Sequence, residues 1–202
     1  MWLKVRKAIE HPDRVLPYFY RWVRQLRLKR IRKDGGVFYE YEGHLYPEYL
    51  NHGNATSFIL DKAKQYCQGE GIDVGADRWP FPGAVPIQEE ENQNAYRLDA
   101  FPDGSLDYVF SSHSLEHLDQ WQDALRLWIR KLKINGILFL YLPHESMLLW
   151  HRGSSWVGDL HKWRPTYQIL NPFLEVNGME IAEHNPDKDR YWSFHIVARR
   201  IK

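Results

Sequence analysis

Short apolar runs that stop abruptly at small or polar residues recur along this chain. The run at 71–75 ends at Gly75, and the run at 106–111 leads into Ser112. Buried parallel strands have this pattern, because both faces of each strand are covered and polar groups collect where the strand ends. The same reasoning predicts further strands at 83–87, 136–142, 179–183 and 191–199.

Helical patterns lie between these runs. Helices are predicted at 56–67 and 165–176, and a third begins at Asp119 and ends at Asn135-Gly136, with a stripe made by Trp121, Leu125, Trp128 and Leu132. Strands that alternate with helices predict a doubly wound, Rossmann-like α/β fold with a mostly parallel sheet and helices on both faces. The last two strands form a predicted hairpin, which would place an antiparallel strand at one edge.

The start of the chain has a different pattern. Residues 14–33 predict a basic amphipathic helix whose apolar stripe is Phe19, Trp22, Val23 and Leu26 and whose other face carries Arg21, Arg24, Arg27 and Arg32. Residues 37–54 are rich in Tyr, His and Gly without clean periodicity, which favours a loop-rich linker or lid. We therefore divide the chain into a basic N-terminal segment, 1–36, and a domain, 37–202.

Charge is distributed unevenly between these parts. The formal net charge of the 202 residues is +1, but residues 1–33 hold eleven of the 27 Lys and Arg and two of the 26 acids. That segment carries +9 and the rest −8, which indicates different partners for the two parts. A basic amphipathic helix suits a peripheral anchor on an anionic membrane surface, a nucleic-acid arm or a cap packed on the domain. We favour the anchor and expect nucleic acid least.

Bulk properties narrow the setting. Hydrophobic residues make up 44% and charged residues 26% of the chain, as in ordinary globular proteins. The single Cys67 excludes an internal disulfide, and no early segment has the pattern of a secretory leader. The longest apolar run, 137–142, is far below the roughly 20 residues that span a bilayer. We expect a cytoplasmic protein, with peripheral attachment to the inner membrane face as an option.

Several polar residues stand where strands should end. Asp73 lies inside a strand that leads into a glycine turn, where free backbone N–H groups can bind an anionic or zwitterionic ligand. Asp73 can organise that turn or accept a hydrogen bond from a ligand amine. Asp99 stands between apolar residues and can accept from an exocyclic amine, while Ala100 and Phe101 pack on an aromatic ring. Ser112-His113 then follows the strand at 106–111.

Together these segments resemble small class I S-adenosylmethionine-dependent methyltransferases. The likeness extends from about Asn54 to Arg200 and rests on the acid-glycine turn, on Asp99-Ala100-Phe101 followed by Pro-Asp-Gly-Ser-Leu-Asp-Tyr-Val, and on Ser112-His113-Ser-Leu-Glu-His. It implies a seven-stranded sheet and S-adenosylmethionine as cofactor. It also implies that the methionine part is surrounded by Asp73, Gly75 and Ala76, that adenine is held by Asp99 and Ala100, and that the pocket is closed by Ser112 and His113.

The chain departs from the family pattern at two places. The family turn usually has two or three glycines, whereas the turn here retains only Gly75. The family also commonly has an acid at the end of the second strand that holds the ribose hydroxyls. Gln88 lies nearest that position and is our choice, with Glu89 as the alternative.

Histidines are the candidate acceptor-side residues. A general base helps when the methyl acceptor is a hydroxyl, and histidine suits that role near neutral pH. Of the four that should lie at the pocket mouth, His113, His117, His144 and His161, we choose His117 and His161 for catalysis or acceptor binding; structural, hydrogen-bonded histidines are the alternative. We expect no metal, but the i, i+3, i+4 spacing of His113, Glu116 and His117 on a helix also allows a divalent ion, with His161 as a fourth ligand.

The acceptor is less defined than the cofactor. Trp150, Trp156 and Trp163 flank the candidate acceptor loop and suit stacking on a sugar, although aromatic residues are also core material. We expect O-methylation of a small molecule or of a surface-polysaccharide sugar. The alternative is a catalytically silent methyltransferase-fold binding or scaffold protein recruited to membrane. A nicotinamide-dependent oxidoreductase is more distant, because the full Gly-x-Gly-x-x-Gly turn is missing.

Overall fold

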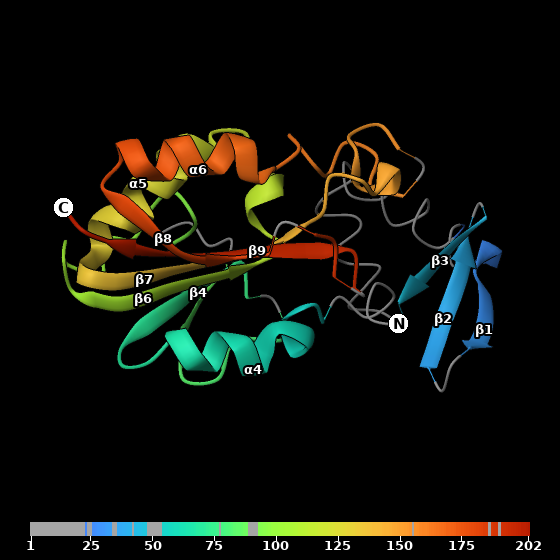
Figure 1. The fold of residues 1–202 in the computed structure, drawn as a ribbon, viewed down its shortest axis with the longest axis horizontal. Coiled ribbons are helices and arrows are strands. Elements are labelled where there is room, and N and C mark those ends of the chain that lie inside the picture. The colour runs from blue at the N-terminus through green and yellow to red at the C-terminus, as the bar shows by residue number, and fades with distance from the viewer. Residues whose placement is uncertain are drawn as a thin grey trace, which may run out of the picture. The chain divides into compact units, whose positions relative to one another are not determined.

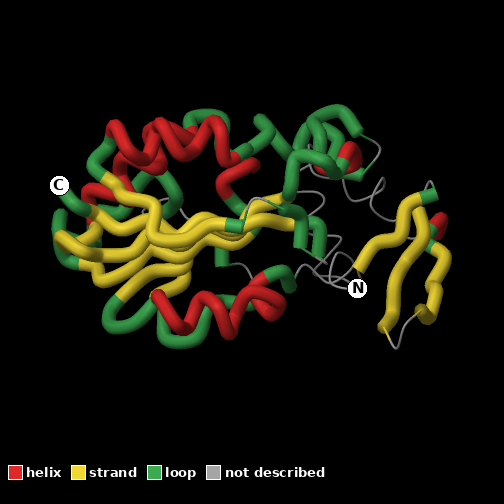
Figure 2. The backbone as a smooth tube through the Cα atoms, viewed as in Figure 1, coloured by secondary structure: helices red, strands yellow, loops and turns green. Residues whose placement is uncertain are grey.

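A six-stranded sheet in the order β5-β4-β6-β7-β9-β8 forms the centre of the larger part of the chain in the computed structural model (Figure 1). Its strands are β4 (Gly71–Val74), β5 (Val85–Ile87), β6 (Leu106–Ser112), β7 (Leu132–Pro143), β8 (Met179–His184) and β9 (Ser193–Arg200). The helices are α4 (Thr56–Tyr66), α5 (Trp121–Lys131) and α6 (Tyr167–Val176), with short 3₁₀ helices η2 (Leu115–His117) and η3 (Leu148–Trp150). The helix α4 lies on one face of the sheet, and α5 and α6 lie on the other (Figure 2).

The structure describes residues 23, 26–33, 36–41, 43–47, 54–76, 78–88, 93–154, 156–185, 187–189 and 191–202, without the side chains of residues 36, 41, 44, 46 and 47. The chain divides into two compact units, residues 1–52 and 53–202. In the described part, no helix is long and apolar enough to cross a membrane.

The first unit contains a small antiparallel sheet in the order β1-β2-β3. Its strands are β1 (Lys29–Lys33), β2 (Gly36–Tyr41) and β3 (His44–Pro47). The helix predicted at 14–33 is therefore wrong from Lys29 onward; residues 26 and 27 are helical, and 14–22, 24 and 25 lie outside the described residues. The loop-rich segment predicted at 37–54 is wrong where β2 and β3 lie, and the predicted boundary between 36 and 37 falls inside β2.

The larger sheet confirms the doubly wound prediction and corrects two of its details. The strands β4, β5, β6 and β7 pair in parallel, and β9 runs antiparallel to both β7 and β8. The antiparallel strand is thus second from the edge, because β9 is buried from residue 193 to 198 and needs cover that an edge strand lacks. Six strands, not seven, form the sheet among the described residues; the stretch at 93–105 forms turns and one bridge, Asn94↔Arg97.

The boundaries of the helices follow local chemistry. Thr166 is the N-cap of α6, and its side chain accepts a hydrogen bond from the Ile169 N–H at 3.2 Å. The helix α5 ends at Lys131, four residues before the predicted stop at Asn135, because β7 begins at once with Leu132. Trp128 of α5 is fully buried in the core, as its predicted stripe requires.

The sheet order places a topological switch point between β4 and β6. After β4 the chain forms β5 on one side of it and then crosses to form β6 on the other. Open α/β sheets bind ligands outside the carboxyl ends of the strands at such a point. The ends of β4 and β6 are therefore the place where functional residues should meet.

Candidate functional site

The turn after β4 contacts the turn after β6. Gly75 has φ +87°, and a Cβ added there would overlap with Oγ and Cβ of Ser114. The Gly75 N–H donates to the Ile87 carbonyl at 2.9 Å, and the Ser111 hydroxyl donates to the Val74 carbonyl at 3.0 Å. Only glycine fits where the left-handed backbone conformation and the close approach coincide. The absence of a side chain at Gly75 therefore allows the ends of β4 and β6 to lie close together.

Asp73 organises this turn from inside the sheet. Its side chain is buried and accepts a hydrogen bond from the Phe81 N–H at 2.7 Å. Burial raises the pKa of Asp73 to about 7, and the hydrogen bond from Phe81 acts in the opposite direction. Of the two roles predicted for Asp73, the observed contact corresponds to holding the loop at 75–81 in place.

Ser112 and His113 form the end of β6 at the same edge. The Oγ of Ser112 is shielded from solvent and has no hydrogen-bond partner among the described residues. His113 has φ +50°, and its Nε2 is 2.8 Å from Oγ of Ser193. Ser193 lies 80 residues later, so the sequence carries no signal for this contact. Burial lowers the pKa of His113 to about 3, which leaves the ring neutral at physiological pH.

The residues predicted for adenine and ribose lie at the surface. Asp99, Ala100 and Gln88 are all exposed, and Gln88 follows directly after β5. The Asp99 carboxylate accepts a hydrogen bond from Nε of Arg97 at 2.7 Å. Glu89 lies outside the described residues. The contacts of these residues with adenine and ribose stay predictions.

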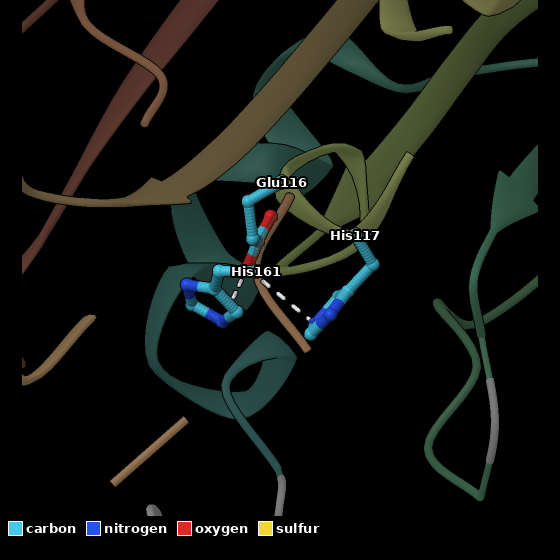
Figure 3. A group of neighbouring side chains, drawn as sticks. All are labelled: Glu116, His117 and His161. Carbon is cyan, nitrogen blue, oxygen red and sulfur yellow. Dashed lines mark ion pairs between the residues drawn. The ribbon is translucent and has the colours of Figure 1, made fainter. Parts of the chain in front are cut away.

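The 3₁₀ helix η2 brings a buried carboxylate next to three histidines. Glu116 is fully buried, and its Oε1 lies 3.9 Å from Nε2 of His117, 3.9 Å from Nε2 of His161 and 3.7 Å from Nδ1 of His113. His161 comes from the loop between β7 and α6, 44 positions beyond His117 in the sequence (Figure 3). Ligand atoms of Glu116, His117 and His161 all lie within 4.8 Å of one another, and His113 is not a member of this group. The helical spacing predicted for these residues is wrong, because η2 is a 3₁₀ helix that begins after His113.

Backbone carbonyls orient two of these histidines. Nδ1 of His117 is 2.9 Å from the Leu160 carbonyl oxygen, and Nδ1 of His161 is 2.8 Å from the Trp150 carbonyl oxygen. A carbonyl only accepts, so Nδ1 carries the proton in each ring and the neutral ring has its lone pair on Nε2. Both lone pairs belong to the atoms that face Glu116.

Two further bonds join η2 to the loop that carries His161. The Lys162 N–H donates to the Glu116 carbonyl at 2.8 Å, and Nε1–H of Trp163 donates to the Leu115 carbonyl at 2.9 Å. Trp163 also stacks on Trp121 with ring centroids 4.2 Å apart. The position of His161 beside Glu116 is therefore fixed by the backbone as well as by packing.

Burial changes the pKa of two groups in this cluster. Burial raises the pKa of the Glu116 carboxyl, and the His117 charge acts in the opposite direction. Burial lowers the pKa of His161 to about 3. Groups whose ionisation is disturbed by burial and that converge at the end of a sheet are typical of functional sites.

The remaining predicted acceptor residues do not join the cluster. His144 contacts Ser146 at 2.9 Å instead. Trp150 is buried and stacks on His161 with ring centroids 5.7 Å apart, and one face of Trp163 stacks on Trp121; the sugar stacking stays a prediction. Ser114 is the site residue that the sequence analysis missed, because only the fold shows its contact with Gly75.

Comparisons with known proteins agree with this architecture. Residues 59–140, from α4 to β7, match a family model described as methyltransferase domain. Two similar structures are an S-adenosylmethionine-dependent methyltransferase from Mesorhizobium loti and one from Thermotoga maritima titled a possible histamine N-methyltransferase. The first is 15% identical with TM-score 0.56 and covers 74% of this chain and 99% of its own; the second is 16% identical with TM-score 0.57 and covers 76% and 93%.

A third similar structure has another title. The [4+2]-cyclase SpnF is 15% identical with TM-score 0.53, and the match covers 81% of this chain and 86% of that one. No curated protein sequence matches this chain significantly. Sequence identities at this level show the fold but not the substrate.

The chain has the fold of class I S-adenosylmethionine-dependent methyltransferases, and its segment from α4 to β7 matches the family model of a methyltransferase domain. The matches support S-adenosylmethionine as its cofactor. The residues fit this ligand at two points. Oγ of Ser112 is a buried polar atom in need of a partner, and the side chain missing at Gly75 lets the backbone turn closely at the switch point.

Proposed function

We propose that this protein transfers a methyl group from S-adenosylmethionine to an oxygen atom of a small-molecule or sugar acceptor. The observation that carries the proposal is the contact between Gly75 and Ser114, which joins the predicted cofactor turn to the strand end that continues into Glu116 and His117. A methyl donor at the switch point and an acceptor beside η2 would thus be neighbours.

Each residue has a distinct role in this proposal. S-adenosylmethionine supplies a methyl group on a sulfonium sulfur, which is already a good leaving group. Because the leaving group is already good, the protein chiefly aligns the acceptor, and alignment can lower the reaction barrier by several kcal/mol. Asp73 holds the turn after β4 in place through its hydrogen bond from Phe81. The acceptor hydroxyl has one proton, which it donates to the Nε2 lone pair of either His117 or His161. His117 is partly exposed and can pass a proton to solvent, whereas buried His161, with its pKa lowered to about 3, orients the hydroxyl.

We also propose that the protein is cytoplasmic and that residues 1–33 attach it to an anionic membrane surface. The +9 charge of this segment supports the attachment. Further support comes from β1, where four basic side chains are exposed: Lys29, Arg30, Arg32 and Lys33.

A catalytically silent binding protein is the second candidate. Its support is the turn that retains a single glycine, together with a shared fold in a protein titled a [4+2]-cyclase. Such a protein would bind S-adenosylmethionine or its product without transferring the methyl group.

One experiment tests the first candidate against the second. Full-length protein is incubated with methyl-labelled S-adenosylmethionine and a panel of sugar, lipid, small-molecule and RNA acceptors, and its melting temperature is measured with S-adenosylhomocysteine and with NAD. We expect a shift with S-adenosylhomocysteine, none with NAD, and label on a hydroxylated acceptor. A shift without transfer to any acceptor supports the silent protein, and no shift overturns the cofactor proposal.

A further inference from the structure

The carboxylate of Glu116 is a buried group that can carry charge, and three histidines surround it without a hydrogen bond to its oxygens. Its side chain is 0% exposed, and neither Oε1 nor Oε2 has a hydrogen-bond partner within the part of the chain that the structure describes. An unpaired buried polar group costs about 1–3 kcal/mol, and more when it is charged. Proteins keep such groups where a ligand or an ion completes them. The described side chains therefore leave the Glu116 carboxylate open to a further partner.

Nδ1 of His113 lies 3.7 Å from Oε1, too far for a hydrogen bond, and the ring nitrogens of His117 and His161 that face Glu116 are acceptors. Nε2 of His117 and Nε2 of His161 each lie 3.9 Å from Oε1, which is too long for a hydrogen bond. The neutral rings carry their protons on Nδ1, bound to the carbonyls of Leu160 and Trp150. Two lone pairs and a carboxylate oxygen thus converge, and the species that satisfies all three is a cation.

The distances suit a metal ion after a small closure. Bonds of about 2.1 Å with tetrahedral angles place ligand atoms about 3.4 Å apart. The two distances of 3.9 Å require each of these pairs to approach by a few tenths of an ångström, and the ligand atoms of His117 and His161, which lie within 4.8 Å of one another, can need a larger approach of about 1 Å. Bonds from the ring Nδ1–H groups to carbonyls are the outer contacts that hold metal-binding histidines in position. Here both histidines already have them.

The donor set defines the class of metal. Two imidazole nitrogens and one carboxylate suit zinc and its first-row neighbours, whereas magnesium and calcium prefer oxygen ligands. We propose that Glu116, His117 and His161 bind one divalent first-row transition-metal ion, with zinc as the reference ion. The 41% exposure of the His117 side chain leaves one side of the site open to solvent. Three protein ligands and an open position are the arrangement of catalytic rather than structural zinc sites.

The open position would take an oxygen ligand. If the proposed methyl transfer is correct, that oxygen belongs to the acceptor, because η2 follows directly after the Ser114 contact with Gly75. Metal binding itself does not depend on methyl transfer. It does compete with proton acceptance at Nε2 of His117, since both use the same lone pair.

The test is a titration of full-length, chelator-treated protein with Zn²⁺ by calorimetry. A parallel titration with Co²⁺ follows the visible absorption of the bound ion. We expect one ion per chain, and at least about a tenfold loss of affinity in Glu116→Gln and in His117→Ala. His151→Ala is the matched control, because His151 lies in the same loop as His161 but outside the group, and it should keep wild-type affinity.

Two results would overturn the metal site: no saturable binding to wild type, or equal affinity in wild type and Glu116→Gln. Because glutamine keeps the shape of Glu116 without its charge, misfolding is checked by the melting temperature of each variant. S-adenosylhomocysteine binding is measured on the same samples and should be unchanged in Glu116→Gln. Failure of the cofactor proposal would remove that binding in every sample, whereas failure of the metal proposal would leave it intact.

Discussion

The backbone N–H of Lys162 donates a 2.8 Å hydrogen bond to the carbonyl oxygen of Glu116. This bond joins a loop that follows β7 to the 3₁₀ helix that follows β6. It sets the spacing between Glu116 and His161, the neighbour of Lys162. This main-chain contact, together with the bond from Trp163 to the Leu115 carbonyl, holds together a cluster whose members are 45 positions apart in sequence.

Removal of this bond should loosen the cluster. Lys162→Pro lacks the donor, so the Glu116 carbonyl loses its partner and His161 is no longer held at its present distance. We expect about a tenfold loss of zinc affinity, because contacts behind metal ligands carry effects of that size. Lys162→Ala keeps the N–H and is the control. Equal zinc affinity in both variants would show that the bond does not position His161.

His117 and His161 should affect turnover rather than cofactor binding. Substitution of either by alanine removes an Nε2 lone pair from the acceptor side, and we expect turnover to fall by about 100-fold. The affinity for S-adenosylhomocysteine should stay within a factor of two or so, since the turn at Gly75 is untouched. His151→Ala serves as the control. Normal rates in both variants would remove the proposed acceptor role of the histidines.

Asp73 should give the stability a characteristic dependence on pH. Burial raises its pKa to about 7 in the folded state, against about 4 in an unfolded chain. The folded state thus holds the extra proton between these values, and the free energy of unfolding falls as pH rises from about 4 to about 7. Asp73→Asn removes this titration and can still accept from Phe81. Its melting temperature, relative to wild type, should be higher at pH 8 than at pH 5; the reverse order would contradict the burial argument.

Membrane attachment should depend on the basic side chains of β1. The full-length variant with Lys29, Arg30, Arg32 and Lys33 changed to Gln loses four of the nine net positive charges of residues 1–33. Each basic residue near an anionic surface contributes about 1 kcal/mol, so binding to phosphatidylserine vesicles in a sedimentation assay should fall strongly. Zwitterionic vesicles are the control. Equal sedimentation of wild type with both vesicle types would contradict an electrostatic anchor.

The sequence predicts the carboxyl ends of β4 and β6 well, because local residue patterns determine where these strands end. The strands ending near Gly75 and Ser112 are apolar runs with clear stops, and the structure places both at the switch point. By contrast, Ser114 and Ser193 carry no local signal, since their partners Gly75 and His113 lie 39 and 80 positions away. Long-range contacts of this kind follow only from the fold.

The strand β1 shows a different cause of error. Its basic residues continue the basic face of the predicted helix, which includes Arg32, so the helical pattern extends through Lys33 in the sequence. The pairing of Lys33 with Gly36 leaves two residues between the strands, and these are Asp-Gly in the sequence. Asp-Gly is a strong short-range hairpin signal, and it was the information that could have corrected the prediction.

Gly75 and Gly83 offer the most direct test of the proposed cofactor pocket. Both have φ +87°, but a Cβ at Gly75 would overlap with Ser114, whereas a Cβ at Gly83 meets nothing within 4 Å. Alanine costs about 1–2 kcal/mol in this backbone conformation at either position, and the overlap with Ser114 adds to the cost at Gly75, so the melting temperature of each variant is measured first. Calorimetric titration with S-adenosylhomocysteine then tests the pocket. We predict saturable one-to-one binding to wild type and to Gly83→Ala and its loss in Gly75→Ala; absence of binding to wild type, or equal affinity in both variants, would contradict the account.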